Sequence, residues 1–156
     1  MGGGGDDSLI GGVGADTMVG GVGDDRYVVD NVGDISSEAA DEGTDHVESS
    51  VDYTLGDHLE NLTLSGSDSL SGTGNALNNV ITGNTGDNTL SGLAGDDSID
   101  GGDDNDTIYG HSGSDTVDGG AGDDYINTRT APGTGLPDLV SLTRDMSVLC
   151  NTRYVR

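Results

Sequence analysis

Apolar residues recur at every ninth position in two stretches of the chain, residues 2–28 and 74–127. In each nine-residue unit the first position is glycine, the sixth is aspartate or asparagine, and the eighth is apolar. The apolar positions are Leu9, Met18, Tyr27, Ile81, Leu90, Ile99, Ile108, Val117 and Ile126. The last three residues of a unit suit a very short β-strand, with the middle side chain pointing inward and its neighbours outward. The pattern therefore predicts short strands at a regular interval.

The first six residues of each unit are predicted to turn, because glycines at positions one, two and four allow backbone angles that other residues avoid. Two units then form one coil of about 18 residues, and coils stack at the strand spacing of ~4.8 Å. The predicted fold class is all-β, a parallel β-roll (a β-helix or solenoid) of nonapeptide repeats. Leu93 and His111 replace glycine at position two, and Asp104 replaces it at position four, so we expect these three turns to be distorted.

The composition limits how such a chain becomes stable. Glycine accounts for 29 of 156 residues, apolar residues for 31%, and there is no Phe or Trp. Such a chain cannot build a large hydrophobic core, and without the periodicity it would suggest disorder. Cys150 is the only cysteine, so an intrachain disulfide is excluded. Some other agent must therefore hold the coils together.

The charge indicates which agent that is. The net charge is −24, which repels nucleic acid and anionic membranes and concentrates cations. Stacked turns that carry aspartates repel one another, and a cation between them reverses the sign of this interaction. Ca²⁺ accepts six to eight oxygen ligands in flexible geometry, including backbone carbonyls, whereas Mg²⁺ requires strict octahedral geometry. Zn²⁺ prefers Cys and His, but His46, His58 and His111 are widely spaced. Several Ca²⁺ ions are therefore the predicted cofactor.

The pattern G-G-x-G-x-D-x-U-x over residues 2–28 and 74–127 resembles the RTX, or hemolysin-type, calcium-binding repeat. The resemblance implies a type I secreted bacterial protein that is extracellular without an N-terminal signal peptide, and Met1 here runs straight into glycines. It also implies that position-six side chains two units apart share an ion, with turn carbonyls completing the shell. The implied partners are therefore calcium and the type I secretion machinery.

The ligands that this resemblance implies fall into two groups. The position-six side chains are Asp7, Asp16, Asp25, Asn79, Asn88, Asp97, Asp106, Asp115 and Asp124. The turn residues are Gly2, Gly20, Gly92, Gly101, Gly110, Gly119, Ala94, Asp103, Ser112 and Ala121. The pairs expected to matter most are Asp7–Asp25, Asp97–Asp115 and Asp106–Asp124. Sites that use Asn79 or Asn88 should be weaker, because these side chains bring no charge. The position-five acids (Asp6, Asp24, Asp87, Asp96 and Asp123) are expected to point outward.

The chain divides into four predicted segments: repeats at 2–28, a bridging insertion at 29–73, repeats at 74–127 with a degenerate first unit, and an atypical flank at 128–156. In the insertion, short alternating runs separated by glycines predict β-structure, which we expect to form wider solenoid coils. Its acids, Asp30, Asp34, Glu38, Asp41 and Asp45, could bind another cation, but a solvated acidic face is the favoured interpretation. The flank holds four of the five arginines and fits a divergent secretion or capping segment, a disordered tail, or a foreign stretch.

No motif predicts an enzyme. HExxH and G-x-S-x-G are absent, and the lack of lysine excludes a Walker loop. The main hypothesis is a structural calcium-binding module that folds when it meets calcium outside the cell. The alternative is a carbohydrate- or surface-binding module from a larger secreted enzyme or adhesin. Its candidate contacts with polysaccharide are Arg26, Tyr27, Tyr53, Tyr109 and Tyr125. No apolar run is long enough to span a membrane, and we expect a monomer or a part of a larger chain.

Overall fold

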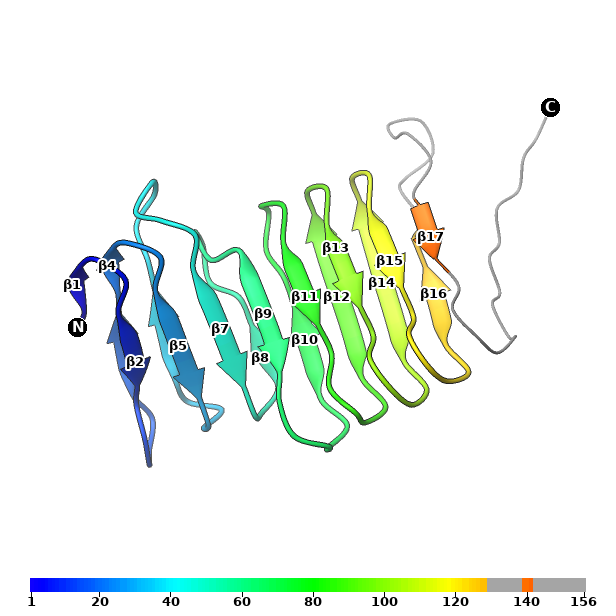
Figure 1. Cartoon of the computed structure of the whole chain (residues 1–156), viewed down its shortest axis with the longest axis horizontal. Coiled ribbons are helices and arrows are strands. Elements are labelled where there is room, and N and C mark those ends of the chain that lie inside the picture. Colours follow the sequence, from blue (N-terminus) through cyan, green and yellow to red (C-terminus); the bar gives the residue numbers. More distant parts are fainter. Residues whose placement is uncertain (129–138, 142–156) are drawn as a thin grey trace.

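The computed structural model describes residues 1–128 and 139–141, and every regular element in them is a β-strand. The strands stack side by side along the longest dimension of the molecule, with the N-terminus at one end (Figure 1). Among the described residues, no helix is long and apolar enough to cross a membrane. The predicted all-β class is therefore confirmed.

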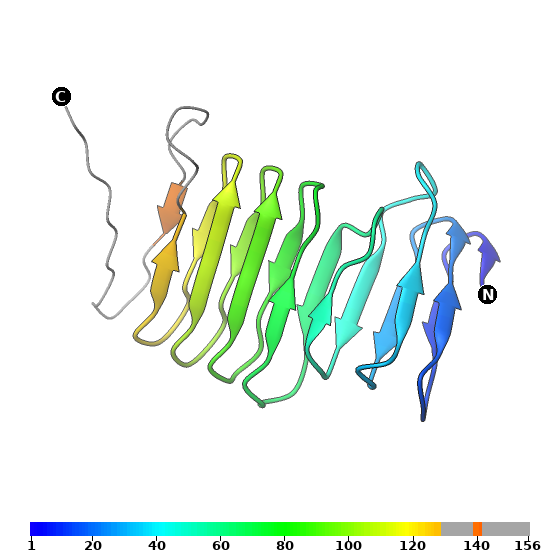
Figure 2. The same ribbon diagram turned by 180° about the vertical axis from the view of Figure 1, so that it is seen from behind.

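Two long parallel sheets form the walls of the stack, and the view from behind shows the second of them (Figure 2). The first sheet contains, in spatial order, β17 (Leu139–Ser141), β15 (Thr116–Asp118), β13 (Ser98–Asp100), β11 (Val80–Thr82), β9 (Asn61–Leu64), β7 (His46–Ser49), β5 (Arg26–Val29) and β2 (Ser8–Ile10). The second contains β16 (Tyr125–Asn127), β14 (Thr107–Ser112), β12 (Thr89–Ala94), β10 (Ser71–Thr73) and β8 (Tyr53–Thr54). Two smaller parallel pairs join β3 (Thr17–Val19) to β6 (Ile35–Ser37) and β1 (Gly3–Gly4) to β4 (Gly21–Val22).

The register confirms the predicted coil. In the repeats each residue pairs with the residue one coil further along: Ser8 with Arg26 in the first stretch, and Val80 with Ser98 in the second. Since consecutive strands of one sheet are parallel and separated by a second strand on the opposite wall, the chain winds as a solenoid. Residues 139–141 add β17 beside β15. The remaining residues of the 128–156 flank, apart from Thr128, lie outside the described residues.

The bridging insertion continues the eight-stranded sheet through β7 and β9, with uneven coils. Asp25 and Asp45 occupy equivalent positions 20 residues apart, Asp45 and Glu60 are 15 apart, and Glu60 and Asn79 are 19 apart. The prediction of wider coils was right for two of these spacings, which exceed the 18 residues of the repeats, and wrong for the third. One coil is shorter, because the strands fix the pairing and the turns absorb differences in length.

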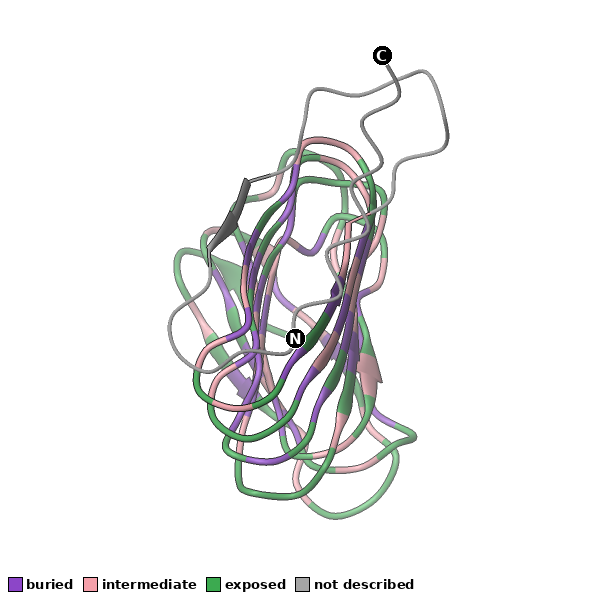
Figure 3. Ribbon diagram, turned by 90° about the vertical axis from the view of Figure 1, so that its right-hand side faces the viewer, coloured by how far each residue is buried: buried purple, intermediate pink, exposed green. Residues whose placement is uncertain are grey.

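A single column of apolar side chains fills the interior. Every predicted inward position of the nonapeptides is buried, from Leu9 at 7% exposed to Ile126 at 4%. The insertion adds further buried residues to the same cluster: Val29, Val47, Leu55, Leu59, Leu62 and Leu64. A view along the stack shows narrow, flattened coils (Figure 3). The core is therefore only about one pair of side chains wide, as the low apolar content requires.

The turns obtain their shape from left-handed residues at positions two and four, such as Gly102 (φ 106°) and Gly122 (φ 144°). Leu93, Asp104 and His111, which replace glycine in three of these turns, adopt the same region, with φ of 75°, 67° and 69°. Leu93 and His111 still pair in register on β12 and β14. The expected distortion of these turns was wrong, because the chain accepts unfavourable backbone angles instead.

Candidate metal centre

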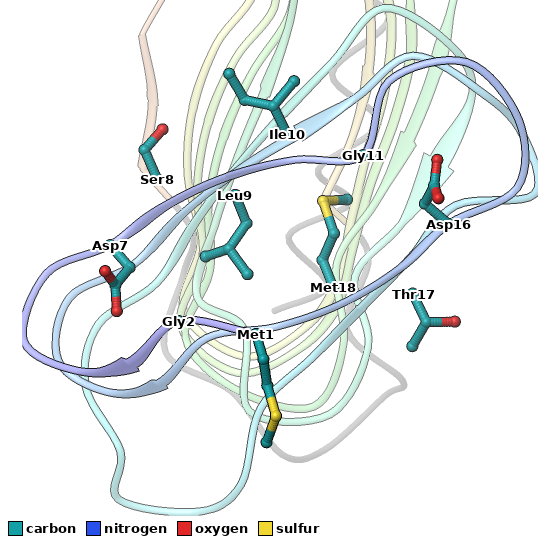
Figure 4. Close-up of a pocket in the computed structure, with 10 residues that line it drawn as sticks. All are labelled: Met1, Gly2, Asp7, Ser8, Leu9, Ile10, Gly11, Asp16, Thr17 and Met18. Carbon is teal, nitrogen blue, oxygen red and sulfur yellow. The ribbon is translucent and has the colours of Figure 1, made fainter.

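The position-six side chains line the two edges of the solenoid. In the first coil Asp7 and Asp16 lie at opposite edges, with Leu9 and Met18 between them, and all four line a pocket at the N-terminal end of the stack (Figure 4). In later coils these side chains are almost fully buried: Asp25, Asp97, Asp106 and Asp115 are at most 2% exposed. The sequence thus places a column of buried carboxylates along each edge.

One oxygen of each carboxylate ties neighbouring coils together. The position-six backbone N–H donates to Oδ1 of the position-six residue one coil further along. This bond joins Asp7 to Asp25 (2.7 Å), Asp97 to Asp115 (3.1 Å) and Asp106 to Asp124 (2.9 Å). It also joins Asn79 to Asp97 and Asn88 to Asp106, both at 2.8 Å. Every predicted pair is therefore in direct contact.

The second oxygen has a different environment. Oδ2 of Asp16, Asp25, Asp97 and Asp106 is buried and accepts no hydrogen bond from any described residue. A buried charged oxygen without a partner is strongly unfavourable. The repetition of the same orphaned atom in several coils points to one shared partner that the protein itself does not provide.

These second oxygens converge with backbone carbonyls beside the position-one glycines. A Cβ placed on Gly2 would lie 2.5 Å from Asp7 Oδ2 and 2.7 Å from the carbonyl oxygen of Gly20 in the next coil. At Gly101, the corresponding atoms are Asp106 Oδ2 and the Gly119 carbonyl oxygen, and both would collide with a Cβ. The position-one glycines do not need a positive φ; they need the missing Cβ. Carboxylate and carbonyl oxygens from successive coils are the ligands that Ca²⁺ prefers.

The other predicted turn residues lie in the same turns but differ in their arrangement. At Gly92 and Gly110 the closest atoms to an added Cβ are Oδ2 of Asp97 and of Asp115. Ala94, Asp103, Ser112 and Ala121 occupy position three, where Asp103 and Ala121 form a parallel bridge. The Ser112 carbonyl already accepts the Gly95 N–H at 3.0 Å. A carbonyl has two lone pairs, so this bond leaves it one for a cation.

Burial makes two of these carboxyl groups unusually basic. Desolvation is the main cause that raises the pKa of Asp97 to about 7, and the charges of Asp115 and Asp96 add to it. Desolvation likewise raises the pKa of Asp106 to about 7, with the charges of Asp124, Asp87 and Asp104 as further causes. Hydrogen bonds from the Asn79 and Asn88 N–H groups oppose these shifts. A divalent cation would remove the repulsion that causes part of them.

Asn79 and Asn88 behave differently from the aspartates. Asn79 Nδ2 donates to the carbonyl oxygens of Leu59 and Glu60, both at 3.2 Å. Asn88 Nδ2 donates to Asn84 Oδ1 at 2.9 Å. These amides therefore satisfy neighbouring oxygens with N–H groups.

Two asparagines at position two, which sequence reasoning did not single out, work in the same way. Asn75 Nδ2 donates to the carbonyls of Gly56 and Leu59 (2.7 Å each). Asn84 Nδ2 donates to those of Ser65 (3.3 Å) and Asp68 (3.0 Å). In the middle of the stack, asparagine amides thus join neighbouring turns without any added ion.

The insertion contains buried acids. The interpretation of its acids as a solvated face was therefore wrong for Asp34 and Asp45. Asp34 is 6% exposed and Asp45 is 1% exposed. Asp34 Oδ1 accepts the Asp16 N–H, Asp45 Oδ1 accepts the Asp25 N–H, and Glu60 Oε2 accepts the Asp45 N–H. Asp30 and Asp41 are exposed, as expected for that face. An acid two residues before an inward-facing side chain, as in Asp45-His46-Val47, was the available signal.

The position-five acids point outward, as predicted: Asp6, Asp24, Asp87, Asp96 and Asp123 are all exposed. Four of them also join neighbouring coils, but in the reverse direction. A position-six carboxylate accepts a backbone N–H of the preceding coil, whereas a position-five carboxylate accepts one of the following coil. Asp6 Oδ1 accepts the Asp24 N–H (3.0 Å) and Asp96 Oδ1 accepts the Ser114 N–H (2.8 Å), each from the following coil. Asp24 and Asp87 accept in the same way from Thr44 and Asn105. These outer acids therefore support the turns from the solvent side.

Comparison with known proteins adds a family match. A profile of the RTX calcium-binding nonapeptide repeat, which spans four copies, matches residues 1–30, 73–108 and 100–129, more than half of the chain. No curated protein and no solved structure matches significantly. The matched residues coincide with the coils that carry the orphaned position-six oxygens.

Proposed function

Because this chain belongs to the family of RTX calcium-binding nonapeptide repeats, we propose that it is a structural module whose β-roll forms around several Ca²⁺ ions. Each ion lies at an edge of the solenoid between two successive coils. The module has no catalytic role and serves the folding of a secreted bacterial protein after export.

One observation carries the proposal. Oδ2 of Asp106 is buried, accepts no hydrogen bond from any described residue, and meets the carbonyl oxygen of Gly119 from the next coil. Asp7 Oδ2 and the Gly20 carbonyl oxygen approach one another in the same way at the other end of the stack. Neighbouring oxygen atoms with negative charge repel one another. A hard cation with flexible coordination, such as Ca²⁺, removes this repulsion.

The proposed ligands follow the pairs that are in contact. The carboxylates are Asp7, Asp16, Asp25, Asp97, Asp106, Asp115 and Asp124, and the carbonyls come from their position-one and position-three neighbours. Asn79 and Asn88 are the weakest of the proposed ligands, because their amide nitrogens already serve backbone and side-chain oxygens. The strongest sites therefore lie between the coils of residues 92–127.

The family is typically extracellular in bacteria, and the proposal extends this to type I secretion. Inside the cell the calcium concentration is low, so the carboxylate columns repel one another and the chain stays unfolded for export. Outside, millimolar calcium matches the range of extracellular sites, whose Kd is about 10⁻⁴–10⁻³ M. Metal binding and folding are then one event. The boundaries at 2–28, 29–73 and 74–127 remain part of this proposal.

Far-UV circular dichroism during a calcium titration tests the proposal. We expect a β-type spectrum that develops with added Ca²⁺, is lost with excess EDTA, and does not develop with equal Mg²⁺. An identical β-type spectrum in EDTA and in calcium would refute calcium-dependent folding.

A second candidate function, carbohydrate binding, is favoured by one aromatic cluster. Tyr109 stacks on His111 with ring centroids 5.7 Å apart and meets the edge of Tyr125 at 6.1 Å. Tyr125 is 40% exposed, whereas Tyr27 is fully buried and unavailable. Calorimetry with neutral and anionic polysaccharides tests this function. Binding that is lost in Tyr109→Ala and Tyr125→Ala, but kept in the exposed control Val80→Ala, would support it.

A further inference from the structure

Three carboxylates meet where the first repeats join the insertion. Asp25 precedes β5, Glu38 follows β6, and Asp45 precedes β7, so they come from three separate segments. One oxygen of each lies within 4.8 Å of an oxygen of both others. Glu38 belongs to no nonapeptide, so this cluster differs from every pair along the repeats.

Two oxygens of the cluster are orphaned and point to the same place. Asp25 is 2% exposed, and its Oδ2 and Glu38 Oε1 are buried without a hydrogen bond from any described residue. Both atoms would collide with a Cβ on Gly20. A buried, unpartnered carboxylate oxygen is costly, and two that converge on one point indicate a missing positive partner.

The remaining oxygens hold the carboxylates in position. Glu38 Oε2 accepts the Gly21 N–H at 3.2 Å, and Asp45 Oδ1 accepts the Asp25 N–H at 2.8 Å. Tyr27 Oη accepts the Gly20 N–H at 2.8 Å. A backbone N–H group therefore holds one oxygen of each carboxylate, since Asp25 Oδ1 accepts the Asp7 N–H. These bonds fix the orientation of the three carboxylates, as a set of metal ligands requires.

No arginine or lysine of residues 1–128 balances this charge. Arg26 is the only arginine in that range, which contains no lysine, and it pairs instead with Glu48 on the exposed surface. Burial raises the pKa of Glu38, and the charges of Asp45, Asp25 and Glu42 add to it. Burial also raises the pKa of Asp45, with the charges of Glu60, Asp25 and Asp24 as further causes.

We propose that Asp25, Glu38 and Asp45 form a three-carboxylate Ca²⁺ site that shares Asp25 with the N-terminal repeats and joins these repeats to the insertion. The proposal rests on the proposed function for the identity of the ion, and on the cluster geometry for its location. The coil between Asp25 and Asp45 is 20 residues long, against 18 in the repeats, and the segment that lengthens it brings in Glu38. Three charges around one ion should give higher affinity than the pairs, because affinity rises with the number of charged ligands.

Glu38→Gln tests the site, since it removes one charge and preserves the shape of the side chain. Counting bound ions by equilibrium dialysis with radioactive calcium on the full chain, we expect Glu38→Gln to bind one ion fewer than the wild type. The matched control is Glu48→Gln, which removes the same charge from a side chain on β7 that is 37% exposed, and it should bind as many ions as the wild type. A Glu38→Gln chain that keeps every ion at unchanged affinity would overturn the proposal.

Terbium luminescence gives a second readout. Tyr27 Oη would lie 2.5 Å from a Cβ on Gly20, beside the converging carboxylates, so Tyr27 should sensitise Tb³⁺ bound there. Tyr27→Phe retains all three carboxylates, and we expect it to lose this part of the emission without losing an ion. Full emission from Tyr27→Phe would overturn the location of the site.

The two proposals fail in different ways. A wild-type chain that binds no calcium would overturn both of them. A wild-type chain that folds with calcium, together with a Glu38→Gln variant that binds as many ions, would overturn the three-carboxylate site alone.

Discussion

The backbone N–H of Asn79 donates to Oδ1 of Asp97 at 2.8 Å, while Oδ2 of the same carboxylate is buried and accepts no hydrogen bond from any described residue. One oxygen of Asp97 therefore serves the stacking of the coils, and the other is directed at the proposed ion. The two oxygens of Asp97 thus have different roles, one structural and one as a proposed ligand. A substitution that removes the charge of the side chain and preserves its shape tests the two roles separately.

Asp97→Asn should weaken calcium binding by about tenfold or more, about 1.4 kcal/mol per tenfold. The amide oxygen still accepts the Asn79 N–H, so the coil contact survives while the charged ligand is lost. Calcium titration followed by circular dichroism measures the effect. The matched control is Asp96→Asn, which removes the same charge from the exposed neighbour. Equal affinities for the two variants would contradict a ligand role for Asp97.

Asn79→Asp should make the middle of the stack dependent on calcium. The change removes the two bonds that Nδ2 donates to Leu59 and Glu60 and adds a charge next to Asp97. At a calcium concentration just sufficient to fold the wild type, we expect a loss of about 1–3 kcal/mol in the free energy of unfolding, measured by urea denaturation, and recovery of part of it in excess calcium. Asn78→Asp, on the exposed neighbour, should change stability by less. A calcium-independent loss would argue against a new ion site.

Gly101→Ala should destabilise the protein by about 1–3 kcal/mol. Its φ lies outside the left-handed region, but its Cβ would collide with Asp106 Oδ2 and the Gly119 carbonyl. Gly4→Ala is the control, because its φ is also outside that region and its nearest contact, the Val22 carbonyl, is 3.9 Å away. Thermal denaturation in calcium compares the two variants. If both lose the same stability, the requirement for space at position one is wrong.

Without metal, the protein should be less stable at pH 8 than at pH 5. The pKa of Asp97 and of Asp106 is about 7 in the fold, against about 3.9 in an unfolded chain. Between these values the folded state binds more protons than the unfolded state, so its stability falls as pH rises. The contribution is complete below about pH 4 and is lost as pH rises through about 7.

Far-UV circular dichroism in EDTA across this pH range measures the dependence, because protonation at pH 5 should restore part of the β-type spectrum that EDTA abolishes at neutral pH. Asp97→Asn removes one of the two titrating groups, so its stability should vary less with pH than that of the wild type. Calcium affinity should change in the opposite direction and rise with pH, because protons compete for the same oxygens. A metal-free stability that increases from pH 5 to pH 8 would contradict the assigned direction.

The repeats could be predicted from the sequence because their fold is local. A nonapeptide contains its own turn, strand and inward side chain. The positions of Gly101, Asp106 and Ile108 within the repeat are therefore enough to predict their roles. The pairing of residues one coil apart follows from the same period. The insertion has no such period: nothing in the linear order of Asp25, Glu38 and Asp45 indicates that their oxygens meet.

The nine-residue period thus determined the solenoid, its inward column and its two edges of carboxylates. Only the tertiary structure decided which oxygens of those carboxylates remain without a partner, and that the amides of Asn75, Asn79 and Asn84 join the middle coils. It also decided that Glu38 reaches the turn of Asp25. The strands fix how the coils pair, and the unequal lengths of the turns then determine which side chains meet at the edge of the solenoid. Contacts within one unit are set by spacing along the chain, whereas contacts between coils depend on how the coils stack.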